Sequence, residues 1–228
     1  MTIGVVLAAA GRGERLGAGA PKAYFALRGE MLLLRALRPF LAHPAVTAVA
    51  VVVGDPSDAR ARAVLGDPRV GLVEGGAERQ DSVRAGIAAL GEADLILVHD
   101  AARPFVTRAL IDAVAEAALR HGAAVPAIPV PETVKRVDGA GFVAATEPRD
   151  RLRLAQTPQG FRAALLRRAH AEAAAAGRRA TDDATLVELI GERVLLVPGD
   201  PHNIKITSPA DRTIAEAILA AVTEAGRG

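Results

Sequence analysis

Short, continuously apolar runs alternate along the first part of the chain with segments whose apolar residues recur at helical spacing. The strand-like runs cover residues 3–8, 46–53, 70–73, 95–99 and 123–130, and the helix-like segments between them cover residues 31–42, 57–65, 78–90 and 107–120. This alternation predicts an α/β fold with a mostly parallel sheet, right-handed crossovers and helices on both faces. Ligands of such sheets bind beyond the carboxyl ends of the strands, which directs attention to the loops after residues 8, 53, 73 and 99.

The pattern changes after residue 130. Two short strand-like segments flank Asp138-Gly139, which predicts a β-hairpin with a glycine turn. Because two strands alone are marginally stable in water, we expect this arm, at about residues 131–150, to pack on a second subunit. Helices at 162–176, 182–190 and 209–222 and strands at 193–197 and 203–206 complete one domain spanning residues 1–228.

Composition excludes several classes of protein. Half of the 228 residues are hydrophobic and 24% are charged, as in ordinary globular proteins. No apolar run reaches the length of about 18 residues that predicts a transmembrane helix. The N-terminus lacks a signal-peptide pattern, and the absence of cysteine excludes disulfides and thiolate chemistry. We therefore expect a cytoplasmic protein that does not bind membranes.

The basic residues are mostly arginines and are scattered. The formal net charge is +2, and one Tyr, no Trp and five Phe leave little for nucleic-acid bases to stack on, so no nucleic-acid partner is expected. Only three of the 28 basic residues are lysines, namely Lys22, Lys135 and Lys205. In a chain so rich in arginine, a lysine indicates a position where the wide, planar guanidinium of arginine cannot replace a compact ammonium.

The loop after the first predicted strand combines small residues with cations. Residues 7–17 read Leu-Ala-Ala-Ala-Gly-Arg-Gly-Glu-Arg-Leu-Gly, and Pro21-Lys22 follow. Backbone amides of such a loop can approach an anion, and Arg15 and Lys22 add charge suited to a triphosphate. The loop matches neither the Walker A motif nor the dinucleotide-binding glycine fingerprint. A flexible glycine turn with solvated cations is the alternative interpretation.

The fourth strand-like run ends in His99-Asp100-Ala101-Ala102-Arg103-Pro104. An acid at the tip of a central strand beside a phosphate loop is well placed to hold Mg²⁺. The alternative is that Asp100 caps a turn and pairs with Arg103. Because the five histidines show no metal-ligand spacing, His99 is expected to be structural.

Two further segments carry candidate contacts. Residues 74–82 place paired glycines before a helix, where they can hold a pyrimidine edge with help from Ser82; an ordinary strand-to-helix turn is the alternative. Lys205 lies in an apolar strand-like segment, where a phosphate partner would explain it. Asp182-Asp183 begin a helix and are expected to be caps. The sequence has no Gly-x-Ser-x-Gly elbow and no His-Glu-x-x-His motif.

These motifs together resemble a known family. The first loop with Pro21-Lys22 resembles the signature of sugar-phosphate nucleotidyltransferases. The segments 75–82, 98–104, 157–159 (Thr-Pro-Gln) and 203–207 (Asn-Ile-Lys-Ile-Thr) narrow the resemblance to the 2-C-methyl-D-erythritol 4-phosphate cytidylyltransferase family of the non-mevalonate isoprenoid pathway. The resemblance extends from residue 3 to about residue 220, and five motifs in order make it specific.

The resemblance implies a Rossmann-like α/β domain, a β-arm that interlocks a homodimer, and Mg²⁺-dependent transfer of CMP from CTP to 2-C-methyl-D-erythritol 4-phosphate, which yields 4-diphosphocytidyl-2-C-methyl-D-erythritol and pyrophosphate. It implies catalytic roles for Arg15, Lys22, Arg149 and Lys205. It implies CTP contacts at Ala9, Ala10, Gly11, Gly13, Gly76, Ala77, Ser82 and Ala101. It implies contacts to the sugar-alcohol phosphate at Arg103, Thr133, Thr157 and Thr181, several of them across the dimer, and a metal ligand at Asp100.

Two positions depart from the family's pattern. Ala77 replaces an acid, which is harmless if the backbone makes the contact there, and His202 stands where relatives carry an acid, which leaves a substrate contact at that position open. Ribitol-5-phosphate cytidylyltransferase activity is the alternative within the class. A nucleotide-binding module without turnover is the alternative outside it, although Arg15, Lys22, Asp100 and Lys205 argue against that alternative.

Overall fold

The computed structural model describes residues 1–11 and 21–225, with side chains up to residue 221. Four parallel strands form its centre: β1 (Ile3–Ala8), β4 (Val46–Val53), β5 (Val70–Glu74) and β6 (Leu95–Asp100). The helices α1 (Leu32–Leu41), α2 (Ala59–Arg62), α3 (Arg79–Ala89) and α4 (Arg108–His121) lie between them in the chain. The predicted alternation of strands and helices is confirmed.

The sheet has the order β10-β7-β11-β6-β1-β4-β5, in which β7 is Ala123–Pro129, β10 is Arg153–Ala155 and β11 is Gln159–Arg162. Strand β12 (Leu195–Pro198) pairs with β7. The chain runs from β1 outward through β4 to β5 and then returns to β6 on the other side of β1. The strand order therefore reverses between β1 and β6, and the crevice outside the carboxyl ends of strands at such a reversal is where open α/β sheets bind ligands.

Helices cover both faces of this sheet, as predicted. Alternate residues of β1 point to opposite sides: Val5 belongs to one buried cluster, with Phe40 of α1 and Ile111 of α4. Val6 belongs to the other cluster, with Ile87 of α3 and Leu166 of α5 (Ala163–Ala175). Because β1 is buried on both faces, its sequence is continuously apolar rather than alternating.

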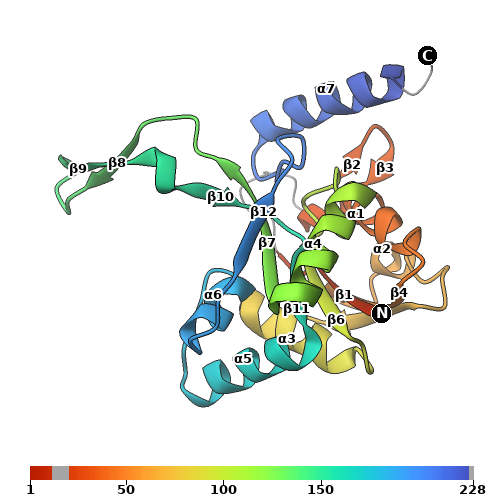
Figure 1. Ribbon diagram of the computed structural model, residues 1–228. Coiled ribbons are helices and arrows are strands. Elements are labelled where there is room, and N and C mark those ends of the chain that lie inside the picture. Colours follow the sequence, from red (N-terminus) through yellow and green to blue (C-terminus); the bar gives the residue numbers. More distant parts are fainter. Residues whose placement is uncertain (12–20, 226–228) are drawn as a thin grey trace.

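The predicted hairpin arm is present and stands away from the body of the molecule (Figure 1). Its strands β8 (Val134–Val137) and β9 (Val143–Glu147) pair only with each other. Apolar side chains on the arm lie in solvent, with Phe142 73% and Val143 60% exposed. The arm thus exposes apolar side chains that no other part of the described chain covers. Such a surface is what the predicted dimer contact requires.

One prediction about a strand was wrong, and two strands were not predicted. The segment 203–206 is not a strand: it forms no ladder, and its extended course is held by single hydrogen bonds such as the one from the Ile206 N–H to the Ala102 carbonyl. The antiparallel strands β10 (Arg153–Ala155) and β11 (Gln159–Arg162) were not predicted, although β11 lies between β6 and β7. Both strands are too short for periodicity to identify them.

The remaining elements are short, or lie in the last third of the chain. They are η2 (Lys22–Tyr24), β2 (Ala26–Leu27), β3 (Glu30–Met31), η3 (Arg149–Arg151), α6 (Asp183–Leu189) and α7 (Pro209–Ala225). Among the described residues, no helix combines the length and the apolar character that crossing a membrane requires.

Candidate active site

A cavity of about 250 Å³ opens at the carboxyl ends of β1, β5 and β6. Its lining residues are Ala8, Ala9, Ala10, Gly11, Lys22, Ala23, Gly76, Ala77, Glu78, Arg79, Ser82, Asp100, Ala101, Ala102 and Lys205. The loops after residues 8, 73 and 99 therefore meet at one place, as the sequence predicted. The loop after residue 53 contributes none of these residues.

One part of the lining consists of small residues and is called the small-residue lining here: Ala9, Ala10, Gly11, Gly76, Ala77 and Ala101. Gly75 lies directly behind it, because a Cβ built there would come within 2.6 Å of Ala10 Cβ and 2.9 Å of Ser82 Oγ. The Gly76 N–H donates to Ser82 Oγ over 3.1 Å, so the buried hydroxyl fixes the turn from inside. The residues of this lining have small side chains without polar atoms. Their only polar groups are therefore those of the backbone.

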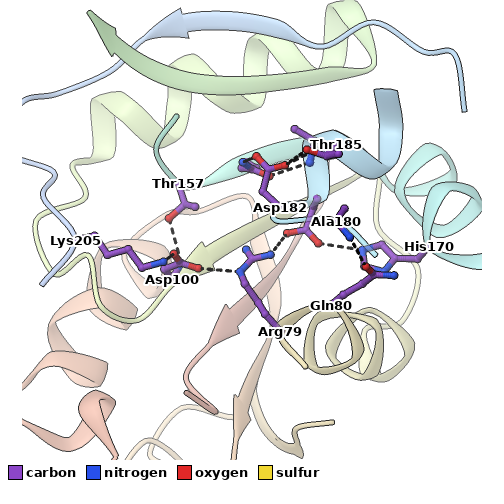
Figure 2. A network of polar contacts seen from close by, with 12 residues as sticks. Arg79, Gln80, Asp100, Thr157, His170, Ala180, Asp182, Thr185 and Lys205 are labelled. Carbon is purple, nitrogen blue, oxygen red and sulfur yellow. Dashed lines mark hydrogen bonds and ion pairs between the residues drawn. The ribbon is translucent and has the colours of Figure 1, made fainter. Parts of the chain in front are cut away.

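Charged residues also line the cavity. Four of them, Lys22, Arg79, Asp100 and Lys205, are called the charged lining, and Glu78 lines the cavity as well. Lys205 Nζ lies 2.6 Å from one carboxylate oxygen of Asp100, and Arg79 Nε lies 3.4 Å from the other (Figure 2). Burial raises the pKa of the Asp100 carboxyl, but Arg79 and Lys205 outweigh it and hold that pKa well below its usual range. Asp100 is therefore an anion at neutral pH, and Lys205 is not an unpaired lysine.

Arg79 was not among the predicted site residues, although it stands in the glycine motif at 75–82. Its Nη1 donates over 2.8 Å to Asp183, whose other carboxylate oxygen lies 3.0 Å from Nε2 of the buried His170. Burial lowers the pKa of Arg79, and its two carboxylate partners raise it further than burial lowers it. The expectation of two caps at 182–183 is confirmed for Asp182, which accepts from the Thr185 N–H, whereas Asp183 is a buried ion-pair partner.

Buried hydrogen bonds support the charged lining from behind. The Asp100 N–H donates to Thr157 Oγ1 over 3.1 Å, and Thr157 Oγ1 lies 2.9 Å from Nδ1 of His99. Nε2 of His99 bonds the Arg103 carbonyl, and burial lowers the pKa of His99 to about 4. The prediction that His99 is structural is confirmed. The hydroxyl of Thr157 is engaged inside the protein, and a substrate contact there stays a prediction.

Arg103 does not pair with the Asp100 carboxylate, which had been the alternative interpretation of that acid. Its Nη1 donates over 2.7 Å to the carbonyl of Asn203, and the amide of Asn203 donates over 2.8 Å to the Thr157 carbonyl. These bonds fasten the extended segment 203–206 beside β6. They bring Lys205 to Asp100 without a strand ladder.

The other predicted site residues lie elsewhere. Thr133 and Arg149 are exposed at the arm, where Arg149 donates to the Pro131 carbonyl, and Thr181 is exposed ahead of α6. His202 is also exposed, with Nδ1 3.4 Å from Asp200. Arg15 and Gly13 lie outside the described residues. Within one chain, therefore, the predicted acceptor contacts at the arm are not brought to the pocket.

A search against models of protein families matches residues 3–221 to IspD, 2-C-methyl-D-erythritol 4-phosphate cytidylyltransferase. The chain belongs to this family. The family resemblance drawn from the five sequence motifs is thereby confirmed.

Individual relatives agree with this assignment. A 2-C-methyl-D-erythritol 4-phosphate cytidylyltransferase from Saccharopolyspora erythraea is 49% identical, with 96% of this chain and 100% of the relative covered. The crystal structure of the protein of that name from Thermus thermophilus has 40% identity and a TM-score of 0.80, covering 96% of this chain and 100% of that one. A bifunctional IspD/IspF enzyme from Rhodopseudomonas palustris is 48% identical over 95% of this chain, which spans 55% of that relative's length. The chain thus corresponds to about half of the bifunctional relatives.

Proposed function

We propose that the chain transfers CMP from CTP to 2-C-methyl-D-erythritol 4-phosphate, releasing pyrophosphate, as a step of isoprenoid biosynthesis. Membership of the family supports this proposal. The observation that carries it is the Asp100 carboxylate, held between Lys205 and Arg79 in a pocket whose remaining lining is mostly small. Small residues leave room for a nucleotide, and the cationic side chains of the pocket can neutralise its phosphates.

The reaction needs positioning and charge rather than a covalent intermediate. A phosphate oxygen of the acceptor attacks the α-phosphorus of CTP in line, and the bond to the pyrophosphate oxygen breaks. Lys22 and Lys205 line the pocket, where their charges can stabilise the negative charge that develops on the transferring group. Arg15 is proposed to act with them on the basis of the resemblance.

Mg²⁺ is proposed as the cofactor, with Asp100 as its ligand from the protein. Among the described residues no group of three or more His, Cys, Asp or Glu side chains could hold a metal ion by itself. Mg²⁺ in nucleotide enzymes is held through one or two carboxylates, with substrate phosphates and water as its other ligands, so a single ionised carboxylate in the pocket fits. The ion would supply additional neutralisation of the triphosphate.

A homodimer in the cytoplasm is proposed as the working form. Arg149 and Thr133 lie on or beside an arm with exposed Phe142 and Val143, which supports contact with a second copy. Light scattering is expected to give twice the chain mass of 23.5 kDa. A fully active monomer at nanomolar concentration would contradict the dimer.

A pyrophosphate-release assay with a panel of acceptors tests the proposed function. With CTP, Mg²⁺ and 2-C-methyl-D-erythritol 4-phosphate, pyrophosphate is expected to form together with one equivalent of the cytidylylated acceptor. A clear preference for ribitol 5-phosphate would support the alternative activity. CTP binding without turnover on either acceptor would indicate a non-catalytic module.

A further inference from the structure

The three glutamines of this chain, Gln80, Gln156 and Gln159, are all buried, and each uses both ends of its side-chain amide to hold another segment. Gln80, in the first turn of α3, donates to the Arg178 carbonyl and accepts from the Ala180 N–H, both over 3.1 Å. Figure 2 shows Gln80 facing Ala180 beside Arg79. An amide that donates and accepts in this way fixes both the distance and the register of the backbone it holds.

Gln159 makes the corresponding pair of bonds on the far side of Thr181. Its Nε2 donates over 2.7 Å to Asp182, and its Oε1 accepts from the Ala184 N–H over 3.1 Å. The segment 178–184 is therefore held on both sides of Thr181 by two glutamines that come from different parts of the fold. Thr181 itself stays exposed between them.

The segment held in this way borders the charged lining of the pocket. A second cavity, of about 330 Å³, is lined by Glu78, Arg79, Gln80, Arg179 and Ala180, and shares Glu78 and Arg79 with the first cavity. Arg79 joins the two regions, because its guanidinium contacts Asp100 on one side and Asp183 on the other. The second cavity therefore combines two arginines and one glutamate with the backbone of the held segment.

We propose that Gln80 and Gln159 are positioning residues that hold the segment 178–184, and with it Thr181, at the acceptor side of the pocket. This inference rests on the proposed function and adds residues that act through the backbone without touching the reacting atoms. Gln80 directly follows Arg79, which lines the first cavity, and both residues lie in the first turn of α3. This one turn therefore shapes the first cavity and also fixes the position of the segment 178–184.

Steady-state kinetics of Gln80→Ala test the proposal, with CTP and 2-C-methyl-D-erythritol 4-phosphate varied in turn. The KM for the acceptor is expected to rise about tenfold, since two hydrogen bonds are lost, while the KM for CTP stays within about twofold. Gln80→Glu preserves size and the bond from the Ala180 N–H but places a carboxylate against the Arg178 carbonyl, so it is expected to raise the acceptor KM as well. Gln159→Ala is expected to act in the same direction.

Arg167→Ala is the matched control for a loss of stability alone. Arg167 donates to the carbonyls of Ile87 and Leu90 at the opposite end of α3, over 3.0 Å in both cases. A variant that merely unfolds in part has fewer active molecules, which lowers kcat and leaves both KM values unchanged. The control is expected to behave in that way.

A double variant shows whether Gln80 acts through Thr181. Thr181→Val alone is expected to raise the acceptor KM, and adding Gln80→Ala is expected to raise it by much less than the product of the two single effects. An acceptor KM unchanged in both Gln80→Ala and Gln80→Glu, with wild-type turnover intact, would overturn this inference and leave the proposed function standing. Lack of wild-type turnover with this acceptor would instead overturn the proposed function.

Discussion

The small-residue lining and the charged lining face the same pocket but depend on different physical properties. Around Gly75 and Gly76 the chain passes so close to Ala10 and to Asp81 that added side chains would collide. Around Asp100 the determining feature is the ion pairs that its carboxylate makes with Lys205 and Arg79, which come from segments distant in the sequence. The comparison indicates that the first lining is sensitive to volume, whereas the second is sensitive to the kind of charge.

The largest expected effect concerns the lysines of the charged lining. Lys22→Arg and Lys205→Arg are each expected to lower kcat by roughly 10²- to 10³-fold, because a guanidinium cannot replace a compact ammonium at the proposed phosphate site. Lys205→Arg is also expected to raise the KM for the acceptor. Steady-state pyrophosphate release measures both parameters.

Lys135→Arg on the arm is the control for these lysine variants, since Lys135 Nζ bonds Thr146 on the exposed hairpin. It is expected to retain activity within about twofold, with thermal melts confirming that all three variants are folded. If all three variants retained near-wild-type activity, the charged lining would lose its assigned role.

A second prediction concerns the support behind the charged lining. The pKa of His99 is about 4 in the folded protein and about 6.5 in the unfolded chain, so only the unfolded chain gains a proton there as pH falls between these values. The free energy of unfolding is therefore expected to decrease from about pH 6.5 to 4, by about 3 kcal/mol from this residue. Urea unfolding of wild type and His99→Gln, without divalent cations, measures the difference.

The His99→Gln variant is expected to lose about 3 kcal/mol less than wild type over that pH range, since other titrating groups are common to both proteins. Parallel pH profiles of the two proteins would contradict burial of a neutral His99. The small-residue lining has no corresponding titrating group, so a pH effect of this origin belongs to the charged lining alone.

A third prediction tests the small-residue lining by adding side-chain volume directly behind it. Gly75→Ala places a methyl group against Ala10 and Ser82, and is expected to raise the KM for CTP about tenfold, the effect of moderate overpacking. Gly71→Ala, in the strand β5 that ends directly before Gly75, is the matched control because its added Cβ meets nothing within 4 Å. Equal KM values for CTP in the two variants would show that close packing behind this lining does not matter for binding.

Much of the fold was predictable because buried parallel strands have a strong local signature. The residue runs of β1 and β4 are apolar, apart from Thr47 near the start of β4, and both were predicted with their observed bounds. β11 was missed because it is four residues long and includes a glycine and an arginine, Gly160 and Arg162. Segment 203–206, which alternates polar and apolar residues, was misassigned because such a segment can be held extended by single hydrogen bonds, as Asn203 shows, without joining a sheet.

Site residues were predictable where the residue type and its place at the end of a strand were enough to indicate a role. Asp100 at a strand tip and the glycines at 75–76 were found in this way, and the pocket includes Asp100 and Gly76. Arg79 and Asp183 were not recognised as partners, because 104 residues separate them and their pairing depends on how α3 and α6 pack.

Equilibrium titration of CTP, without acceptor, into Gly75→Ala and Lys205→Arg tests the division between the two linings most directly. Gly75→Ala is expected to weaken CTP binding about tenfold, whereas Lys205→Arg should bind CTP within about twofold of wild type while turning over far more slowly. The opposite result, with CTP binding intact in Gly75→Ala and lost in Lys205→Arg, would contradict the account, because the charged lining would then be what holds the nucleotide.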